Sequence, residues 1–215
     1  MTIAAQSIIK EAQIMLNDEG GVYWPATELV EYLNDGLREA VTLRPDLFTV
    51  AAPLALVAGV KQAMPATCIS FMGMPRNTNG APISRADQNL LDAVEPSWRS
   101  KAGTLVIEHF CYDPREPKAF QVYPPAAVGA SVDLLHSAMP TAIAAPGGAA
   151  WSTVTGDIPC SDVAKNPLIH WCLFRAFAKN TESAGNAAMS AAHYQLFGSG
   201  LVSDATTKQT VAPTS

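Results

Sequence analysis

The segment 161–180 most constrains the fold, because it predicts a helix that is apolar on almost every side. A helix with one apolar stripe can lie on a surface, but a helix that is apolar all round has to be covered all round. The chain therefore needs other elements packed against this helix, and Trp171 is predicted to be a core residue. The large apolar residues of the segment are Leu168, Ile169, Trp171, Cys172, Leu173, Phe174 and Phe177.

Two helices at the N-terminus are predicted to supply part of that cover. The first spans 3–17, with Thr2 as its cap, and Pro25 opens the second, where its missing N–H costs nothing. Gly36 falls on the apolar stripe of the second helix. Because glycine inside a helix costs about 1 kcal/mol relative to alanine, we expect a close approach of another helix at Gly36. The two helices are predicted to form an antiparallel hairpin.

The middle of the chain has the patterns of strands and turns. Segments 48–57 and 60–65 are predicted to form a hairpin around Ala58 and Gly59, and 67–77 a third strand. A short helix capped by Asp87 follows, and a second hairpin turns at 113–117. Segment 131–140 is a further strand, and 141–159, which shows little regular structure in its sequence, is predicted to be a functional loop or arm.

The order of these elements predicts an α+β fold, in which N- and C-terminal helices form a small helical bundle with a β-rich insertion between them. An alanine-rich helix, 183–198, follows the apolar helix. We assign 1–46 to the N-terminal helical hairpin, 47–158 to the β-rich insertion, 159–202 to the C-terminal helix pair and 203–215 to a flexible tail.

Composition and charge narrow the functional classes. Hydrophobic residues make up 48% of the chain and charged residues only 15%, against about 25% in a typical soluble domain. Such a deficit indicates surface that neighbouring subunits cover. The net charge is −5 and the 14 Lys and Arg residues are scattered, which argues against tight binding of duplex DNA.

Targeting and redox features point to the cytoplasm. The N-terminus lacks the pattern of a signal peptide, and no apolar stretch is long enough for a membrane span. The four cysteines have wide spacings that show no disulfide framework. We therefore expect a reduced, cytoplasmic protein that contacts no membrane.

No catalytic, cofactor-binding or metal-binding residues are predicted. Cys160, His170 and Cys172 lie close in sequence, but residues two apart on a helix point to different faces, so we interpret them as packing residues. His109 and Cys111 share a strand face, which by itself is a weak signal. An unrecognised enzyme using a cysteine with His170 stays as an alternative, although the common nucleophile, phosphate-binding and zinc motifs are absent from the sequence.

Six residues are candidates for contacts with partners. Trp151 lies in the long loop, where an aromatic side chain can anchor an interface. Arg38, Arg175 and Lys179 lie on helices that are predicted to be neighbours, and they form either a salt-bridged face or a subunit contact. Ala187 and Ala191 lie on the alanine-rich helix, whose small side chains allow close approach.

Three stretches of the sequence resemble a phage head–tail adaptor (connector) family. They are GGVYWPATELVEYLNDGLREAVTLRPD at 20–46, YDPREPKAFQVYPP at 112–125 and LFRAFAKNTESAGNAAMSAAHYQLF at 173–197. The resemblance covers nearly the whole chain except its end, 203–215. The matching positions are Trp24, Glu28, Leu29, Tyr32, Leu33, Asn34, Asp35, Phe174, Arg175, Ala176, Phe177, Lys179, Asn180, Glu182, Ala184, Gly185 and Asn186.

This resemblance implies a structural virion protein and no enzymatic activity. Adaptors of this kind form a homo-oligomeric ring, typically of twelve copies, in the neck of the particle between the portal protein and the tail or nozzle protein. The ring continues the DNA channel, and DNA passes through it without sequence-specific binding. The alternative function is another virion neck or tail-completion interaction protein.

Overall fold

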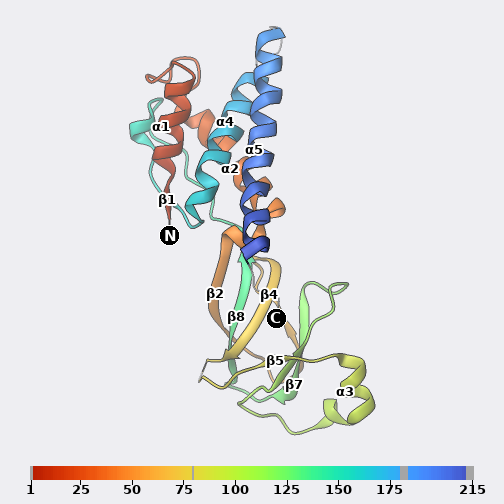
Figure 1. Ribbon diagram of the computed structural model, residues 1–215. Coiled ribbons are helices and arrows are strands. Elements are labelled where there is room, and N and C mark those ends of the chain that lie inside the picture. The colour runs from red at the N-terminus through yellow and green to blue at the C-terminus, as the bar shows by residue number, and fades with distance from the viewer. Residues whose placement is uncertain (1, 79, 180–183, 212–215) are drawn as a thin grey trace. The chain divides into compact units, whose positions relative to one another are not determined.

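The computed structural model describes residues 2–78, 80–179 and 184–211, with the backbone alone over 203–211. The fold is a mixed α+β fold, as the sequence predicts (Figure 1). None of the described helices combines the length and the apolar character that crossing a membrane requires.

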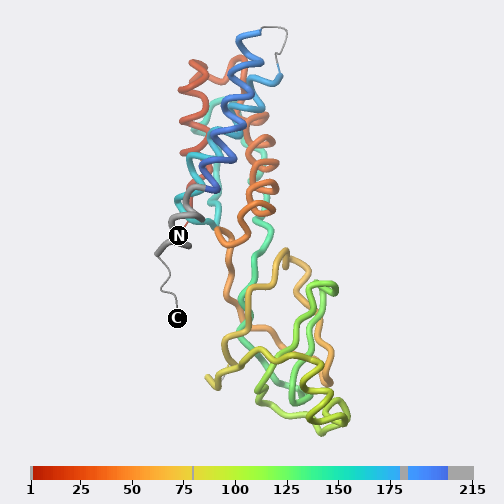
Figure 2. Tube along the Cα trace, turned by 45° about the vertical axis from the view of Figure 1, so that its right-hand side comes forward, coloured from red at the N-terminus to blue at the C-terminus, as the bar shows by residue number. Residues whose placement is uncertain are grey.

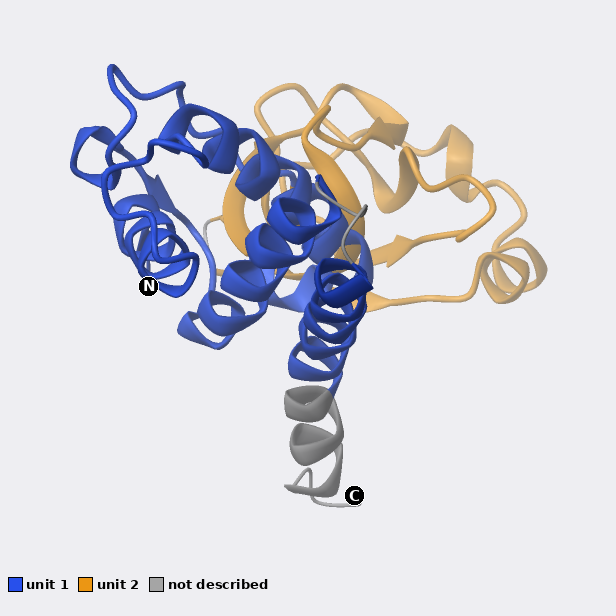
Figure 3. Cartoon of the chain, turned by 90° about the horizontal axis from the view of Figure 1, so that it is seen from above, with its two compact units in different colours: residues 1–48, 139–215 blue, residues 49–138 orange. Residues whose placement is uncertain are grey.

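The chain divides into two compact units (Figure 3). Unit 1 comprises Met1–Phe48 and Met139–Ser215, and unit 2 comprises Thr49–Ala138. The residues 139–158, which the sequence analysis grouped with the β-rich segment, belong to unit 1. Their hydrogen bonds to the first two helices, described below, are the physical reason.

Unit 1 contains the helices α1 (Ala5–Met15), α2 (Ala26–Leu43), α4 (Lys165–Ala178) and α5 (Ala184–Val211). Figure 2 shows them side by side with roughly aligned axes. α4 contacts α1, α2 and α5, and α1 contacts α2 much less. Trp171, Cys172 and Leu173 of α4 are buried, whereas Phe174 and Phe177, which the prediction also expected to be covered, are only partly buried.

Gly36 of α2 lies directly against Trp171 of α4. It is buried, and a Cβ atom placed there would lie 2.6 Å from Cδ1 of Trp171. Only glycine leaves room for the indole ring, so the predicted close approach at Gly36 is confirmed. Pro25 precedes α2 as predicted, with φ −63° and an extended ψ of 149°.

The first residues of the chain differ from the prediction. The helix α1 begins at Ala5, and Ala4, not Thr2, occupies the cap position, without a side-chain hydrogen bond. Ile3–Ala4 form strand β1, which pairs antiparallel with β9 (Asp157–Ile158). This pairing satisfies backbone groups through a segment distant in sequence, which local helix signals do not reveal.

We call residues 139–156 the strap, and it is tied to α1 and α2 by hydrogen bonds. The side chain of Asn34 donates to the carbonyl of Ile143 (3.0 Å) and accepts from its N–H (2.8 Å). The N–H of Ala26 donates to the carbonyl of Ala149 (2.6 Å). The strap therefore has a defined path on unit 1 and is not a loose arm.

Unit 2 contains two sheets, whose strands pair antiparallel except for one parallel pair in the second sheet. One has the order β2 (Thr49–Ala55), β8 (Ser131–Ala138), β4 (Cys68–Asn77), and the other β3 (Gly59–Ala63), β7 (Ala119–Ala126), β6 (His109–Cys111), β5 (Ser84–Arg85). The prediction that β2 and β3 form a hairpin is wrong, because the chain passes from one sheet to the other at residues 56–58. The predicted hairpin across 113–117 is confirmed by the pairing of β6 with β7.

Aromatic side chains join the two sheets in the core of unit 2. Phe71 of β4 contacts the ring of Phe110 (5.4 Å between centroids) and that of Phe120 (6.4 Å), which belong to the other sheet. Asp87 caps the short helix α3 (Gln88–Val94), and its carboxylate accepts the N–H of Asn89 (2.7 Å). The predicted cap is therefore confirmed.

The C-terminal segment is helical further than the sequence predicts. α5 continues to Val211, so the expected aperiodic tail at 203–215 is wrong for the backbone of 203–211. Residues 212–215 lie outside the described residues. The sequence of 203–211 lacks the apolar periodicity that marks a packed helix. Helix propagation from the packed part of α5 accounts for the continuation to Val211.

Candidate assembly surface

The side of α5 that faces α4 carries the few buried side chains of the helix. Ser190, His193, Phe197 and Leu201 recur at helical spacing and are buried. The ring of Phe197 lies 4.8 Å from that of Trp171 between centroids, and the hydroxyl of Ser190 donates to the carbonyl of Phe174 (3.2 Å). These contacts fix α5 on α4 and determine which side of α5 points outward.

The outward side of α5 is uncharged and partly apolar. From Ala184 to Val202 the sequence holds no Asp, Glu, Lys or Arg. Met189, Leu196 and Val202 are exposed by 46%, 46% and 58% in the isolated chain. Helices that face water normally carry charged residues on their outer side, so we define the exposed residues of 184–202 as the α5 outer face and take this face as the candidate site.

The predicted residues Ala187 and Ala191 are both exposed on α5. The sequence analysis missed the larger apolar side chains Met189, Leu196 and Val202. Their residue types are visible in the uncharged stretch 184–202, but which of them are exposed depends on how α5 packs on α4.

The three predicted cationic residues come together on α2 and α4. Arg38 forms an ion pair with Asp35 (2.7 Å), and Arg175 approaches the same carboxylate (3.7 Å). Lys179 pairs with Glu28 (2.7 Å). All three cations are therefore balanced by carboxylates of α2, as the salt-bridged interpretation expects.

The electrostatics of Glu28 follow from its neighbours. Burial alone would raise the pKa of Glu28, but hydrogen bonds from Lys179 and Tyr32 outweigh burial and hold the pKa below its ordinary value. Burial and the hydrogen bond to Glu28 raise the pKa of the Tyr32 phenol. Glu28 therefore stays ionised and Tyr32 neutral, and this group stabilises the contact of α2 with α4.

Trp151 is half-buried against the core of unit 1. The backbone N–H of Trp151 donates to the side-chain oxygen of Gln13 (2.9 Å). The ammonium group of Lys10 lies 4.8 Å from the centroid of the Trp151 ring. Trp151 lies in the strap, and it packs on α1 through the 3-10 helix Trp151–Thr153. The structure thus brings Arg38, Arg175 and Lys179 together and places Trp151 in a different part of unit 1.

The cysteines and histidines have packing partners. Burial raises the pKa of the Cys160 thiol to about 11 and that of Cys172 to about 12, which disfavours the nucleophilic thiolate. Nδ1 of His170 lies 3.1 Å from Nδ1 of His193 on α5. Among the described residues, no group of three or more His, Cys, Asp or Glu side chains could hold a metal ion.

The His170–His193 pair gives unit 1 a predicted pH dependence. Burial lowers the pKa of both imidazoles, and the neighbouring His170 lowers that of His193 further. Below about pH 6.5 the unfolded chain binds protons that the folded chain resists, so stability falls as the pH falls. The slope is at most about 1.4 kcal/mol per pH unit for each proton of difference.

We expect His193→Phe to flatten this dependence, because phenylalanine keeps a ring next to Phe177, whose ring stacks on His193 at 5.6 Å. Melting temperatures of the wild type and the variant between pH 7.5 and 5.0 measure the difference. The buried His136 of unit 2, whose pKa is also lowered by burial, is present in both proteins and cancels. Equal slopes for the two proteins would show that the pair does not titrate with folding.

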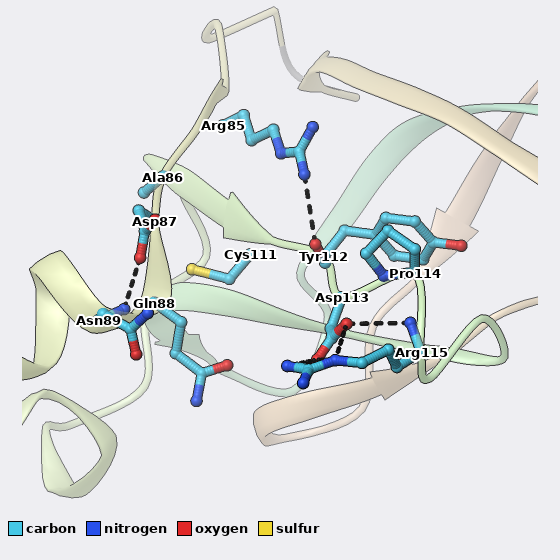
Figure 4. A pocket seen from close by; sticks show the side chains of 10 residues that line it. All are labelled: Arg85, Ala86, Asp87, Gln88, Asn89, Cys111, Tyr112, Asp113, Pro114 and Arg115. Carbon is cyan, nitrogen blue, oxygen red and sulfur yellow. Dashed lines mark hydrogen bonds and ion pairs between the residues drawn. The ribbon is translucent and has the colours of Figure 1, made fainter.

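A hollow in unit 2 has a volume of about 560 Å³ and lies beside α3 and the β6–β7 hairpin (Figure 4). The guanidinium of Arg115 forms an ion pair with Asp113 (2.8 Å), and Arg85 donates weakly to the carbonyl of Tyr112 (3.4 Å). Both interactions are made between residues that line the hollow. The arrangement shows no set of convergent unpaired groups that would define a substrate.

We compared the chain with models of known protein families, and the match indicates a structural protein. The family model described as SU10 adaptor protein matches residues 3–214. The chain therefore belongs to the SU10 adaptor protein family, which confirms the resemblance to phage head–tail adaptors and marks it as a structural component of the virion. A comparison with curated proteins gives no match.

Proposed function

We propose that the protein is a head–tail adaptor that forms a ring between the portal protein and the tail or nozzle protein and continues the DNA channel. The ring holds twelve copies, as the resemblance implies, and is assembled in the host cytoplasm. In this proposal the helices of unit 1 form a bundle that serves as the scaffold of the ring, and unit 2 is an insertion in that scaffold.

One observation carries the proposal: the α5 outer face is long, uncharged and partly apolar. At 1.5 Å per residue, the stretch 184–202 is roughly 28 Å long. Apolar surface in water is unfavourable by about 25 cal/mol per Å², so covering Met189, Leu196 and Val202 favours association. The membership of an adaptor family makes neighbouring virion proteins, including further copies of the chain, the natural partners.

The charge distribution supports a channel that DNA passes without being held. Binding of phosphates depends on unpaired Lys and Arg residues that replace counterions. Arg38 and Lys179 are paired with carboxylates, and the chain carries a net charge of −5. A surface of this kind does not retain DNA that moves through it.

Mixing the protein with the portal ring of the same phage tests the function. Sedimentation velocity should show a complex heavier than the portal by the mass of a ring, and negative-stain images should show an added layer at one end of the portal. A protein that stays monomeric in the absence of portal agrees with the proposal, because assembly on a template is expected. A protein that never associates with portal or tail proteins contradicts it.

A charge placed on the α5 outer face should block assembly. Ala191 is exposed, so Ala191→Glu is expected to leave the melting temperature nearly unchanged. Burying an unpaired carboxylate at an interface costs several kcal/mol, so assembly on the portal should weaken at least tenfold. The matched control is Thr27→Glu, at an exposed position in the first turn of α2. Equal assembly of both variants with the wild type would remove Ala191 from the interface.

A further inference from the structure

Two histidines join α4 to the first half of α5. Nδ1 of His170 lies 3.1 Å from Nδ1 of His193. The ring centroids are 5.2 Å apart, which is nearly the separation of the two nitrogens with both ring radii added, so the nitrogens point almost directly at each other. Two neutral imidazoles meet in this way when one Nδ1 carries a hydrogen and donates it to the other. The contact is therefore an N–H···N hydrogen bond.

This hydrogen bond accommodates one additional proton but not two. If one imidazole becomes an imidazolium, a single hydrogen still lies between the rings and the bond gains a charged donor. If both are imidazolium ions, each Nδ1 carries a hydrogen, so two donors face each other and two positive charges repel. The second proton therefore requires the rings to separate.

The first half of α5 has few other attachments to α4. Among the described side chains of 184–196, only Ser190 and His193 are buried. Ser190 contributes one hydrogen bond, to the carbonyl of Phe174 (3.2 Å). The ring of Phe177 stacks on that of His193 at 5.6 Å between centroids, so this contact also depends on the position of His193. Loss of the histidine contact therefore leaves Ser190 as the buried side chain of this half.

The second half of α5 is held independently of the histidines. The ring of Phe197 lies 4.8 Å from that of Trp171 between centroids, and the guanidinium of Arg44 donates to the carbonyl of Leu201. None of these four groups changes its charge between pH 5 and 8. A fall in pH within this range therefore leaves the contacts of the second half in place.

Charged groups on the elements packed against the two histidines have other partners. α5 contacts α4 and the 3-10 helix Asp162–Ala164, and α4 also contacts α1 and α2. Between Ala184 and Val202, α5 has no Asp, Glu, Lys or Arg, and Asp162 acts on the thiol of Cys160. The interactions on α1, α2 and α4 are Lys165 with Glu11, Arg38 and Arg175 with Asp35, Lys179 with Glu28, Arg44 with Asp46, Glu31 with Tyr32 and Lys10 with the ring of Trp151.

We infer that His170 and His193 form a proton-operated latch, which releases the first half of α5 from α4 when both imidazoles are protonated and leaves the second half docked. The inference does not depend on the proposed ring. Burial lowers the pKa of both imidazoles, and His170 lowers that of His193 further, so the closed latch binds protons less readily than the open one. The open latch therefore gains population as the pH falls below about 6.5, the ordinary pKa of histidine.

The latch affects part of the α5 outer face. Ala187, Met189 and Ala191 are exposed on the half of α5 that opens, whereas Val202 lies on the half that stays docked. Acid would therefore free the first part of this face from its fixed position on α4.

Hydrogen exchange of the full chain between pH 7.5 and 5.0, corrected for the intrinsic exchange rate at each pH, tests the latch. Protection of 190–196 should fall about tenfold per pH unit below pH 6.5, because opening takes up one further proton. Protection of 197–202 should persist. Unchanged protection of 190–196 at pH 5.0, or simultaneous loss over both halves of α5, would overturn the inference.

Two variants assign the effect to the latch. His193→Phe keeps a ring beside Phe177 and binds no proton, so protection of 190–196 should become independent of pH. The matched control His109→Asn removes a histidine of β6 in unit 2 and should keep the wild-type profile. The wild-type profile decides the matter alone if His193→Phe does not fold. The same pH profile in His193→Phe as in the wild type would contradict the latch.

Nitrogen NMR of histidine-labelled protein at pH 8 tests the hydrogen bond itself. One of the two imidazoles should be in the Nδ1–H tautomer and the other in the Nε2–H tautomer, with the signal of His193 identified by its loss in His193→Phe. Two Nε2–H tautomers would mean that no hydrogen joins the Nδ1 atoms, and the latch would be wrong.

Discussion

Replacing Gly36 by leucine is expected to lower the free energy of unfolding by about 3 kcal/mol, the upper end of the cost of overpacking a core. A Cβ atom at this position would lie 2.6 Å from Cδ1 and 2.9 Å from Cγ of Trp171. The indole has little freedom to withdraw, because its ring also contacts those of Phe174 and Phe197. Chemical denaturation followed by tryptophan fluorescence measures the loss.

Alanine substitutions provide the matched control for Gly36. Gly198 lies inside α5, and a Cβ atom there meets no other atom within 4 Å. Gly198→Ala should therefore stabilise the protein by up to about 1 kcal/mol through helix propensity, whereas Gly36→Ala should destabilise it. An equal gain from both substitutions would mean that α2 and α4 do not meet closely at Gly36.

Replacing Gln13 by leucine is expected to cost about 2–4 kcal/mol, because it removes three hydrogen bonds between α1, the start of α2 and the strap. The carbonyl of Ala149 keeps the N–H of Ala26 as a partner, but the carbonyl of Trp24 and the N–H of Trp151 lose the partner that Gln13 provides. Each buried polar group left without a partner costs about 1–3 kcal/mol. The midpoint of urea unfolding measures the effect.

Gln6 serves as the comparison, because it also bonds to the strap but is less buried. Its side chain donates to the carbonyl of Ser152 (3.2 Å), and water can replace that bond. Gln6→Leu should therefore cost less than about 1 kcal/mol. Proteolysis of the strap should increase in Gln13→Leu and stay unchanged in Gln6→Leu, and the reverse order would contradict the role assigned to Gln13.

Local sequence signals predicted those elements whose structure depends on near neighbours. Pro25 marked the start of α2, Asp87 capped α3, and the turn at 113–117 joined β6 to β7. Gly36 was informative because its helix-propensity cost requires compensation, and the compensation is contact with Trp171. Each of these signals involves chemistry that acts within a few residues or along one helix face.

Features that depend on distant residues were predicted less well. A glycine at 59 favoured a hairpin, but β2 pairs with β8 and β3 with β7, and the choice of partner is made by the cores of the two sheets. The strap looked like a loose loop because its own sequence lacks apolar periodicity. Its order comes from Gln13 and Asn34 on α1 and α2, which are more than a hundred positions away.

The sequence predicted that the candidate site lies on α5, but it predicted only some of the residues and contacts of that helix. The small side chains of Ala187 and Ala191 predicted an assembly surface on α5, and both alanines are exposed. The contact between His170 and His193 was not predicted. It depends on the rotation of α5 about its axis, which the packing of Phe197 and Leu201 sets and which composition alone does not reveal.

A symmetric cryo-electron microscopy reconstruction of the neck in purified particles tests the central claim most directly. The account predicts a closed ring of this chain in contact with the portal, with Met189 and Leu196 of each copy buried against a neighbouring copy. A neck in which the α5 outer face stays open to solvent, or particles that contain no copies of the chain, would contradict the account.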